Sequence, residues 1–126
     1  LDLDHFKAFN DRHGHFAGDD AIRLVADTLR DQLRLGDDCA RLGGEEFAVV
    51  VADTSVDEAV AIAHRIHEAI AARSRAELVD AVTVSVGVAS WNGSESTASL
   101  MRRADDLLAS AKQAGRNRVV FENEGG

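Results

Sequence analysis

Apolar positions recur along the chain at two spacings, which together predict alternating helices and strands. Apolar residues at helical spacing predict helices over about 17–33, 55–72 and 97–113, with a shorter one over 5–11. Continuous or alternating apolar residues predict strands over 38–42, 46–52, 82–91 and 118–122. This pattern, with a hairpin near its centre, indicates an α/β domain built as an α+β sandwich, with helices packed on one sheet.

Turn and capping residues indicate where several elements begin and end. Gly43-Gly44 separates two predicted strands and suits a two-residue hairpin turn with positive φ angles. Ser55, with Glu58 after it, is a capping box that begins a helix. Residues 1–4 have the pattern of a strand end, so we expect the sequence to be part of a longer chain.

The size and composition fit one globular domain, expected over 1–122, with a tail over 123–126. The chain has 126 residues, 45% hydrophobic and 29% charged, which excludes collagen-like and strongly disordered classes. A membrane-spanning helix needs about 20 apolar residues, and the longest apolar runs here are far shorter. We therefore expect a cytoplasmic domain, with any membrane anchor lying upstream.

The charge balance restricts the class of partner. The net charge is −8, from 22 acidic and 14 basic residues, which argues against a nucleic-acid partner. An acidic protein still handles a phosphorylated substrate when a divalent cation and a few placed basic groups offset the repulsion. Lys7 and Lys112 are the only lysines in the chain.

A first polar cluster lies at the beginning of the chain. It comprises Asp2-Leu3-Asp4-His5-Phe6-Lys7, then Asn10, His15 and Asp19. A carboxylate at a strand end, such as Asp2, is a usual position for a hard cation such as Mg²⁺. The simpler interpretation makes Asp2 a solvated strand end and Asp4 the N-cap of the next helix. These residues alone leave both interpretations open.

A second cluster coincides with the predicted hairpin and consists of Gly43-Gly44-Glu45-Glu46-Phe47. The bare glycine backbone lets a ligand approach closely. Glu45 and Glu46 face opposite sides of the next strand, so they cannot share one role. The alternative interpretation is a solvated hairpin tip.

A third cluster lies at the predicted end of the last long helix. Lys112 and Arg116 are four positions apart, which places them on one helical face, where they could grip one polyphosphate. Basic residues at a helix C-terminus also complement the helix dipole, which is the alternative explanation.

Taken together, the clusters resemble the diguanylate cyclase family, the GGDEF domains, in its GGEEF form. The matching motifs span nearly the whole chain: Asp-Leu-Asp-His-Phe-Lys at 2–7, Asn-Asp at 10–11, Gly-His at 14–15, Gly-Asp at 18–19, Arg-Leu-Gly-Gly-Glu-Glu-Phe at 41–47, Thr-Val-Ser-Val-Gly-Val at 83–88, Ala-Asp at 104–105 and Ala-Lys-Gln-Ala-Gly-Arg-Asn at 111–117. The resemblance implies a central, mainly antiparallel sheet flanked by helices, related to nucleotidyl cyclases and polymerase palm domains, with the active-site β-hairpin at 43–44. It also implies that two GTP condense to cyclic di-GMP with release of two pyrophosphates.

The resemblance also implies a role for each matching residue. Implied metal ligands for Mg²⁺ or Mn²⁺ are Asp2, Glu45 and the carbonyl of Leu3. Glu45, or a water near it, is the implied activator of the 3′-hydroxyl, and Glu46 assists. The implied substrate-binding residues are Lys7, Lys112 and Arg116 for the phosphates, and Asn10, His15 and Asp19 for the guanine pocket. A carboxylate at Asp19 would accept hydrogen bonds from guanine N1–H and the 2-amino group, which adenine lacks, so GTP is preferred over ATP.

The resemblance extends to regulation and assembly. Arg34 and Asp37 form an R-x-x-D at the family spacing for an inhibitory product site, where the guanidinium could grip phosphate or guanine in a bidentate way. Arg65 matches the second inhibitory arginine, which often comes from a neighbouring molecule. A surface ion pair is the alternative. Because each site holds one GTP, the resemblance implies a transient homodimer, controlled by an upstream sensory or regulatory region.

The main alternative function is a catalytically inactive GGDEF domain that acts as a receptor for GTP or cyclic di-GMP. Such domains usually lose the hairpin carboxylates, whereas Asp2, Glu45 and Glu46 are all present. We therefore favour an active enzyme. One departure from the family pattern is Ala109, where a tyrosine is usual, and its effect on the phosphate site stays open.

Overall fold

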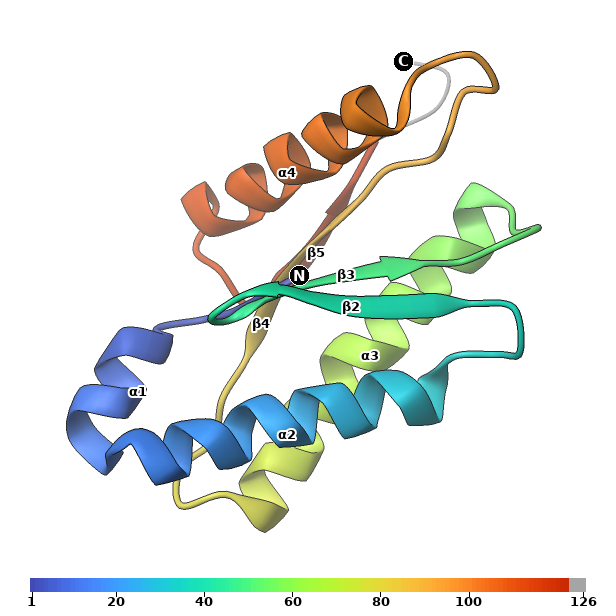
Figure 1. Ribbon diagram of the computed structural model, residues 1–126. Coiled ribbons are helices and arrows are strands. Elements are labelled where there is room, and N and C mark those ends of the chain that lie inside the picture. The colour runs from blue at the N-terminus through green and yellow to red at the C-terminus, as the bar shows by residue number, and fades with distance from the viewer. Residues whose placement is uncertain (123–126) are drawn as a thin grey trace.

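The computed structural model describes residues 1–122, which form helices around a single sheet (Figure 1). In chain order the elements are β1 (Asp2–Leu3), α1 (Phe6–His13), α2 (His15–Gln32), β2 (Asp38–Gly43), β3 (Glu46–Val50), α3 (Val56–Glu77), β4 (Val84–Val88), α4 (Thr97–Gln113) and β5 (Arg118–Phe121). The expected tail, residues 123–126, lies outside the described residues. None of the helices within 1–122 is long and apolar enough to cross a membrane.

The five strands lie in the order β2-β3-β1-β4-β5. β1 is central and pairs antiparallel with β3 on one side and β4 on the other, so that Asp2 stands opposite Glu46 and Ser85. The β2–β3 hairpin is antiparallel too, whereas β4 and β5, joined through α4, run parallel. The prediction of a mainly antiparallel sheet is confirmed.

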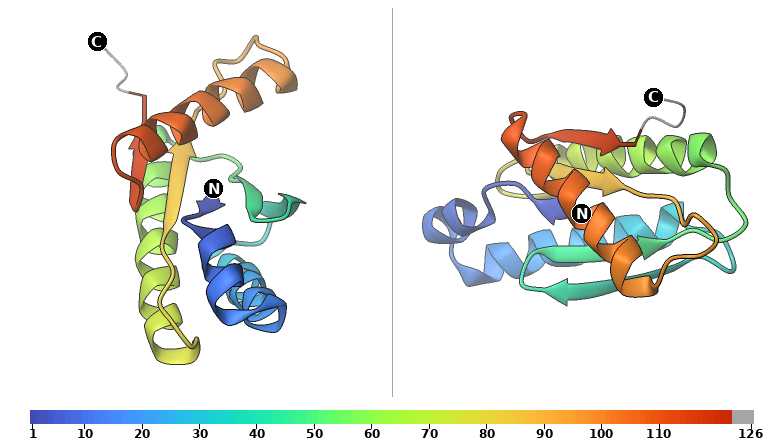
Figure 2. Two further views of the ribbon diagram at one scale, coloured as in Figure 1. Left: turned by 90° about the vertical axis from the view of Figure 1, so that its left-hand side faces the viewer. Right: turned by 90° about the horizontal axis from the view of Figure 1, so that it is seen from above.

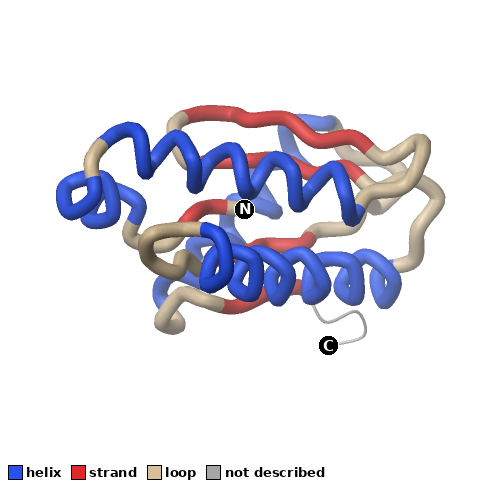
Figure 3. The backbone as a smooth tube through the Cα atoms, turned by 90° about the horizontal axis from the view of Figure 1, so that it is seen from below, coloured by secondary structure: helices blue, strands red, loops and turns tan. Residues whose placement is uncertain are grey.

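Helices cover both faces of this sheet. α2 and α3 lie side by side on one face, and α4 crosses the opposite face (Figures 1 and 3). α1 packs against α2 at one end of the domain (Figure 2). The layer between the sheet and the α2–α3 pair holds much of the buried core, including Val25, Leu29, Ile66, Ile70 and Val84. These layers confirm the predicted α+β sandwich.

A glycine permits the close approach of α4 to the sheet. A Cβ added to Gly87 of β4 would lie 2.4 Å from the backbone nitrogen of Leu108 and 2.5 Å from the carbonyl oxygen of Ala104. Only glycine fits between strand and helix at that separation. The helix that carries Lys112 thereby packs directly on β4, the strand next to β1.

The predicted end of α3 was wrong, because the helix continues past residue 72 to Glu77. Polar contacts hold these extra turns. Arg73 donates to Glu77 at 3.2 Å and to Asp31 of α2 at 3.0 Å. The buried hydroxyl of Ser74 bonds to the segment before β4. Apolar periodicity, from which the end was predicted, does not register such contacts.

The strand expected over 82–91 is shorter than predicted, since β4 covers only Val84–Val88. The chain then enters a loop with its own hydrogen bonds. The indole N–H of Trp91 donates to the carbonyl of Glu95 at 2.9 Å. The side chain of Asn92 accepts from the backbone N–H groups of Ser94 and Glu95, both at 2.9 Å. This Asx-type turn belongs to the loop that leads from β4 to α4.

Candidate active site

The centre of the sheet brings the predicted metal ligands together. Asp2 on β1 is directly opposite Glu46 on β3. The backbone N–H of Leu3 donates to the carbonyl of Glu45 at 3.2 Å. Residues more than 40 positions apart in the sequence therefore meet where β1 passes the end of the hairpin.

The side chain of Asp2 is buried and only partly satisfied. Asp2 as a whole is 8% exposed. Oδ2 accepts a hydrogen bond from Nζ of Lys112, with which it forms an ion pair. Oδ1 is buried without a hydrogen-bond partner among the described residues. A buried carboxylate oxygen without a donor is costly, and a cation is a partner that would satisfy it.

The donors present fit a hard divalent cation. Within residues 1–122, no group of three or more His, Cys, Asp or Glu side chains lies close enough to hold a metal by itself. Mg²⁺ is commonly bound through one or two carboxylates, with waters and substrate phosphates completing the octahedron. Asp2, Glu45 and the carbonyl of Leu3 offer oxygen ligands of that kind.

The hairpin turn differs from the prediction. Gly43 pairs with Glu46, so the turn residues are Gly44 and Glu45, and neither glycine has a positive φ. The guanidinium of Arg41 explains the shape. Its Nε donates to the carbonyls of Gly43 at 3.2 Å and Gly44 at 3.1 Å, and its Nη2 donates to Gly44 at 2.6 Å. These bonds, with a register shift between Arg41 and Gly43, hold the turn without left-handed backbone.

The sequence did not lead us to predict a role for Arg41 at the hairpin. It belongs to the Arg-Leu-Gly-Gly motif, and an arginine two positions before a Gly-Gly turn is within reach of the turn carbonyls. The glycines themselves leave open space, because a Cβ at Gly43 or Gly44 would meet no atom within 4 Å. A ligand can therefore approach the turn backbone closely.

The predicted guanine pocket lies where α1 meets α2. Asn10 comes from α1, and its Oδ1 is buried without a hydrogen-bond partner among the described residues. Gly18 of α2 makes room for it, because a Cβ there would lie 1.8 Å from that oxygen. Asp19 follows Gly18 and is exposed, as is His15 at the beginning of α2. The structure thus brings Asn10 next to the turn of α2 that carries Asp19.

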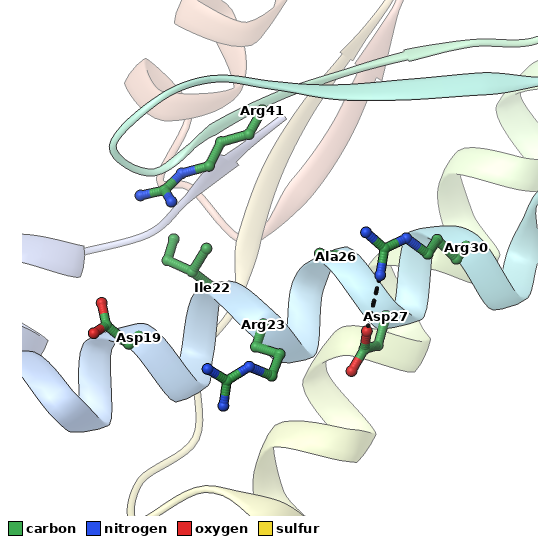
Figure 4. Close-up of a pocket in the computed structure, with 7 residues that line it drawn as sticks. All are labelled: Asp19, Ile22, Arg23, Ala26, Asp27, Arg30 and Arg41. Carbon is green, nitrogen blue, oxygen red and sulfur yellow. Dashed lines mark hydrogen bonds and ion pairs between the residues drawn. The ribbon is translucent and has the colours of Figure 1, made fainter.

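A groove of about 470 Å³ connects Asp19 with the hairpin. Figure 4 shows it between α2 and the β2–β3 turn, with Arg41 on the opposite side from the helix. The lining residues are Asp19, Ile22, Arg23, Ala26, Asp27, Arg30 and Arg41. The arginines on α2 form weak exposed pairs with acidic neighbours, as Arg30 does with Asp27 at 3.4 Å. The groove therefore offers positive charge beside the residue predicted to read guanine.

The two basic residues near the end of α4 are not arranged as predicted. α4 ends at Gln113, so Lys112 is in its last turn and Arg116 lies beyond it, with φ 65°. The N–H of Gly115 donates to Lys112 and that of Arg116 to Ala111, at 3.3 and 2.9 Å. This is a Schellman ending, which reverses the chain at Gly115. Lys112 and Arg116 therefore do not share a helical face.

Lys7, the other lysine, is exposed on α1. Among the described residues it forms no ion pair, whereas Lys112 is paired with Asp2. Lys7 is therefore available to a ligand, while Lys112 has first to leave its carboxylate.

Arg34 and Asp37 form an ion pair at 3.3 Å within a wider network. Asp37 accepts from the backbone N–H of Arg34 at 3.0 Å and of Ala52 at 3.1 Å. Arg34 Nη2 donates to Thr54 Oγ1 at 2.6 Å. Backbone donors, first that of Arg34, hold the pKa of Asp37 below its ordinary value. Arg65 is exposed on α3 and has no hydrogen bond or ion pair to this network within residues 1–122.

Comparisons with known proteins agree with this fold and identify the family. Residues 1–118 match the family model described as "Diguanylate cyclase, GGDEF domain". Diguanylate cyclase A of Treponema denticola is 43% identical over 126 residues, and diguanylate cyclase DgcP of Pseudomonas aeruginosa is 41% identical over 122. The alignments cover 96% and 94% of this chain. The chain therefore belongs to the GGDEF-domain family of diguanylate cyclases.

Solved structures give the same result for the fold. The GGDEF domain of DgcB from Caulobacter crescentus, determined in complex with c-di-GMP, superposes with a TM-score of 0.88 and is 38% identical, covering 95% of this chain and 73% of that one. The active GGEEF domain of a diguanylate cyclase from Vibrio cholerae gives 0.86 at 31% identity, covering 98% and 80%. This chain spans only 33% and 18% of the lengths of the Treponema and Pseudomonas cyclases.

Proposed function

We propose that this domain is a diguanylate cyclase that condenses two GTP into cyclic di-GMP with release of two pyrophosphates. The observation that carries the proposal is the meeting of Asp2, Leu3 and Glu45 at the sheet centre, with a lysine on the buried aspartate. The identity to curated diguanylate cyclases supports it.

Asp2, Glu45 and the carbonyl of Leu3 would hold Mg²⁺ or Mn²⁺. A bound divalent ion supplies charge stabilisation at the reacting phosphate and lowers the pKa of an oxygen it binds. The carboxylate of Glu45, directly or through a water, accepts the proton of the 3′-hydroxyl. Glu46, the next residue along the chain and the first of β3, adds negative charge that favours cation binding.

The other site residues hold the nucleotide. Lys7, Lys112 and Arg116 neutralise the β- and γ-phosphates, which are the leaving group once the α-phosphate is attacked. Asn10 and Asp19 read the base, with His15 beside them. Asp19 supplies the acceptor for guanine N1–H and the 2-amino group, and an adenine nucleotide would leave that carboxylate unpaired.

The reaction needs two nucleotides in mutual contact. The 3′-hydroxyl of one GTP attacks the α-phosphorus of the other, the new P–O bond forms, and the bond to pyrophosphate breaks. The 3′-hydroxyl of the second GTP then attacks the α-phosphorus of the first, which releases the second pyrophosphate and closes the ring. Because one site holds one GTP, two domains face each other in a transient two-fold dimer. A region upstream of the domain would control how often two domains meet.

Product inhibition is part of the same proposal. Arg34 and Asp37 would bind cyclic di-GMP, with Arg65 contributed by a neighbouring domain. Asp37 is already engaged with the N–H groups of Arg34 and Ala52, whereas the side chain of Arg34 is 52% exposed. Arg34 is therefore the residue more readily available to the product.

The test is incubation of the purified protein with GTP and Mg²⁺, followed by chromatographic detection of cyclic di-GMP. Synthesis that disappears in Glu45→Gln supports the proposal. A protein that binds GTP or cyclic di-GMP tightly but makes no product would instead be an inactive receptor.

A further inference from the structure

Asp4 is buried and fully hydrogen-bonded, yet it has no role in the chemistry proposed above. It is 7% exposed. Its Oδ1 accepts from Ser85 Oγ at 2.6 Å, and its Oδ2 accepts from Thr83 Oγ1 at 2.7 Å and from the backbone N–H of Asn117 at 2.9 Å. It does not cap α1, whose N-cap is His5 without any side-chain cap. The interpretation of Asp4 as a helix cap was therefore wrong.

Asn117, which donates its backbone N–H to Asp4, belongs to a segment with left-handed backbone. Arg116 and Asn117 have φ angles of 65° and 50°, in the left-handed region that non-glycine residues disfavour. Two such residues in succession persist only when surrounding contacts hold them there. The contacts that hold this segment therefore determine the position of Arg116.

Three backbone polar groups at and next to Arg116 have hydrogen-bond partners. Its N–H donates to Ala111 at 2.9 Å, and its carbonyl accepts from Arg118 Nε at 2.9 Å. The following N–H, of Asn117, donates to Asp4. The first two partners belong to neighbouring segments of the chain, whereas Asp4 lies 113 positions away.

We propose that Asp4 is a positioning residue: its carboxylate fixes the Arg116–Asn117 segment relative to β1, so that Arg116 meets the terminal phosphates of a nucleotide held at Asp2. This inference rests on the proposed function. Asp4 follows Leu3 directly, so the strand that supplies the candidate metal ligands also anchors the segment that carries the phosphate-binding arginine. The hydroxyl of Thr83 donates to Oδ2, the same oxygen that accepts from Asn117, whereas the hydroxyl of Ser85 donates only to Oδ1.

A second contact to Asn117 comes from α3. His67 Nε2 and Asn117 Oδ1 are 2.8 Å apart, so the side chain of Asn117 is held as well as its backbone. This contact is exposed, whereas the bond to Asp4 is partly buried. Because buried hydrogen bonds are less weakened by water, Asp4 is the stronger of the two anchors.

The test compares two probes on the intact protein with Mg²⁺: guanosine 5′-(β,γ-imido)triphosphate and GMP, which lacks the terminal phosphates. Asp4→Ala removes the carboxylate that accepts the N–H of Asn117. The triphosphate should bind about ten-fold more weakly, and GMP within about two-fold of wild type. Ser85→Ala is the matched control, because it removes a partner of Oδ1 and leaves Oδ2 with its donors.

A double-mutant cycle decides whether Asp4 acts through Arg116. Arg116→Gln should weaken binding of the triphosphate selectively, and adding Asp4→Ala should then change the affinity for the triphosphate less than about two-fold. Equal weakening of both probes, or additive losses, would overturn the inference. If Asp4→Ala does not fold, Thr83→Val takes its place: a selective loss supports the inference, and an equal loss or no loss overturns it. A wild-type protein that binds neither probe would overturn the proposed function together with this inference.

Discussion

Lys112 Nζ and Asp2 Oδ2 form an ion pair between α4 and β1, across 110 positions of sequence. The lysine thus neutralises a carboxylate that the proposed function assigns to a metal ion. On the proposed function, a cation bound there would release Lys112 towards the phosphates. Its ammonium would then compete with the cation before nucleotide arrives and cooperate with it afterwards.

Lys112→Met separates these two effects. Removing the ammonium should tighten binding of Mn²⁺ in the absence of nucleotide, by several-fold up to about ten-fold. The reason is that the variant lacks the positive charge of Lys112, which repels the metal ion. The same variant should bind the GTP analogue more weakly. Isothermal titration with Mn²⁺ alone and then with the analogue gives both numbers. Lys7→Met is the control and should weaken only the nucleotide. Weaker Mn²⁺ binding in Lys112→Met would contradict the competition.

Glu45→Gln should abolish cyclic di-GMP synthesis without unfolding the protein. The side chain keeps its shape at the half-exposed turn but loses the negative charge and the ability to accept a proton. We expect a loss of at least about a hundred-fold in kcat. Circular dichroism checks the fold. Synthesis at the wild-type rate in a folded variant would show that the hairpin carboxylate has another role.

Asp19→Ser should relax the choice of base. Asp19 is exposed at the groove between α2 and the hairpin, so its substitution removes a nucleotide contact without opening the core. The ratio of kcat/KM for GTP over ATP should fall by about a hundred-fold or more. Asp20→Ser, next along the same helix and outside the groove lining, should leave the ratio unchanged. An unchanged ratio in Asp19→Ser would mean that guanine is read elsewhere.

Much of the fold could be predicted because it is recorded in local patterns. Apolar periodicity located the long helices, and Ser55 is the N-cap of α3, with its hydroxyl accepting from the backbone N–H of Glu58 at 3.2 Å. The mainly antiparallel sheet and the meeting of the metal-ligand candidates came from the family resemblance. Periodicity failed at the ends of α3 and β4, since it does not register the polar contacts of the last turns of α3 or of the loop after β4.

The site details that could not be predicted depend on contacts between distant segments. Asp4 bonds to Ser85 and Asn117, 81 and 113 positions away, and no spacing rule reports such pairs. The placement of Arg116 was different, because the necessary signal was present. Gly115 already indicated a helix end, and a helix that ends there cannot carry Arg116 on the same face as Lys112.

Glu95 should make stability depend on pH in the acid range. Hydrogen bonds from Arg103, and next from Ser99, lower the pKa of Glu95 from 4.5 to about 2. A carboxyl with a depressed folded-state pKa stabilises the fold fully above its unfolded value and loses that contribution as pH falls through the folded value. The melting temperature of wild type should therefore exceed that of Glu95→Gln by a constant amount above about pH 5, and the gap should shrink towards pH 2. A gap independent of pH would contradict this.

Arg34→Ala and Asp37→Ala should separate product inhibition from loop stability. Arg34 is half-exposed and its side chain bonds to Asp37 and Thr54, so its removal should relieve inhibition by added cyclic di-GMP and leave the initial rate unchanged. Asp37 is different, because it accepts the N–H groups of Arg34 and Ala52 and its side chain is only 2% exposed. Asp37→Ala leaves two backbone donors without their acceptor, so it should lower the melting temperature as well as relieve inhibition.

Initial rates at increasing cyclic di-GMP, with a melting curve for each variant, measure both effects. Arg30→Ala is a suitable control, since it removes an exposed arginine of α2 that pairs with Asp27 and should leave inhibition by product intact. Loss of inhibition in Arg34→Ala at an unchanged melting temperature means that the guanidinium binds product. Inhibition that persists in Arg34→Ala means that the Arg34–Asp37 pair is a structural contact and no product site. In that case Asp37, which accepts the two backbone N–H groups, provides the stabilisation.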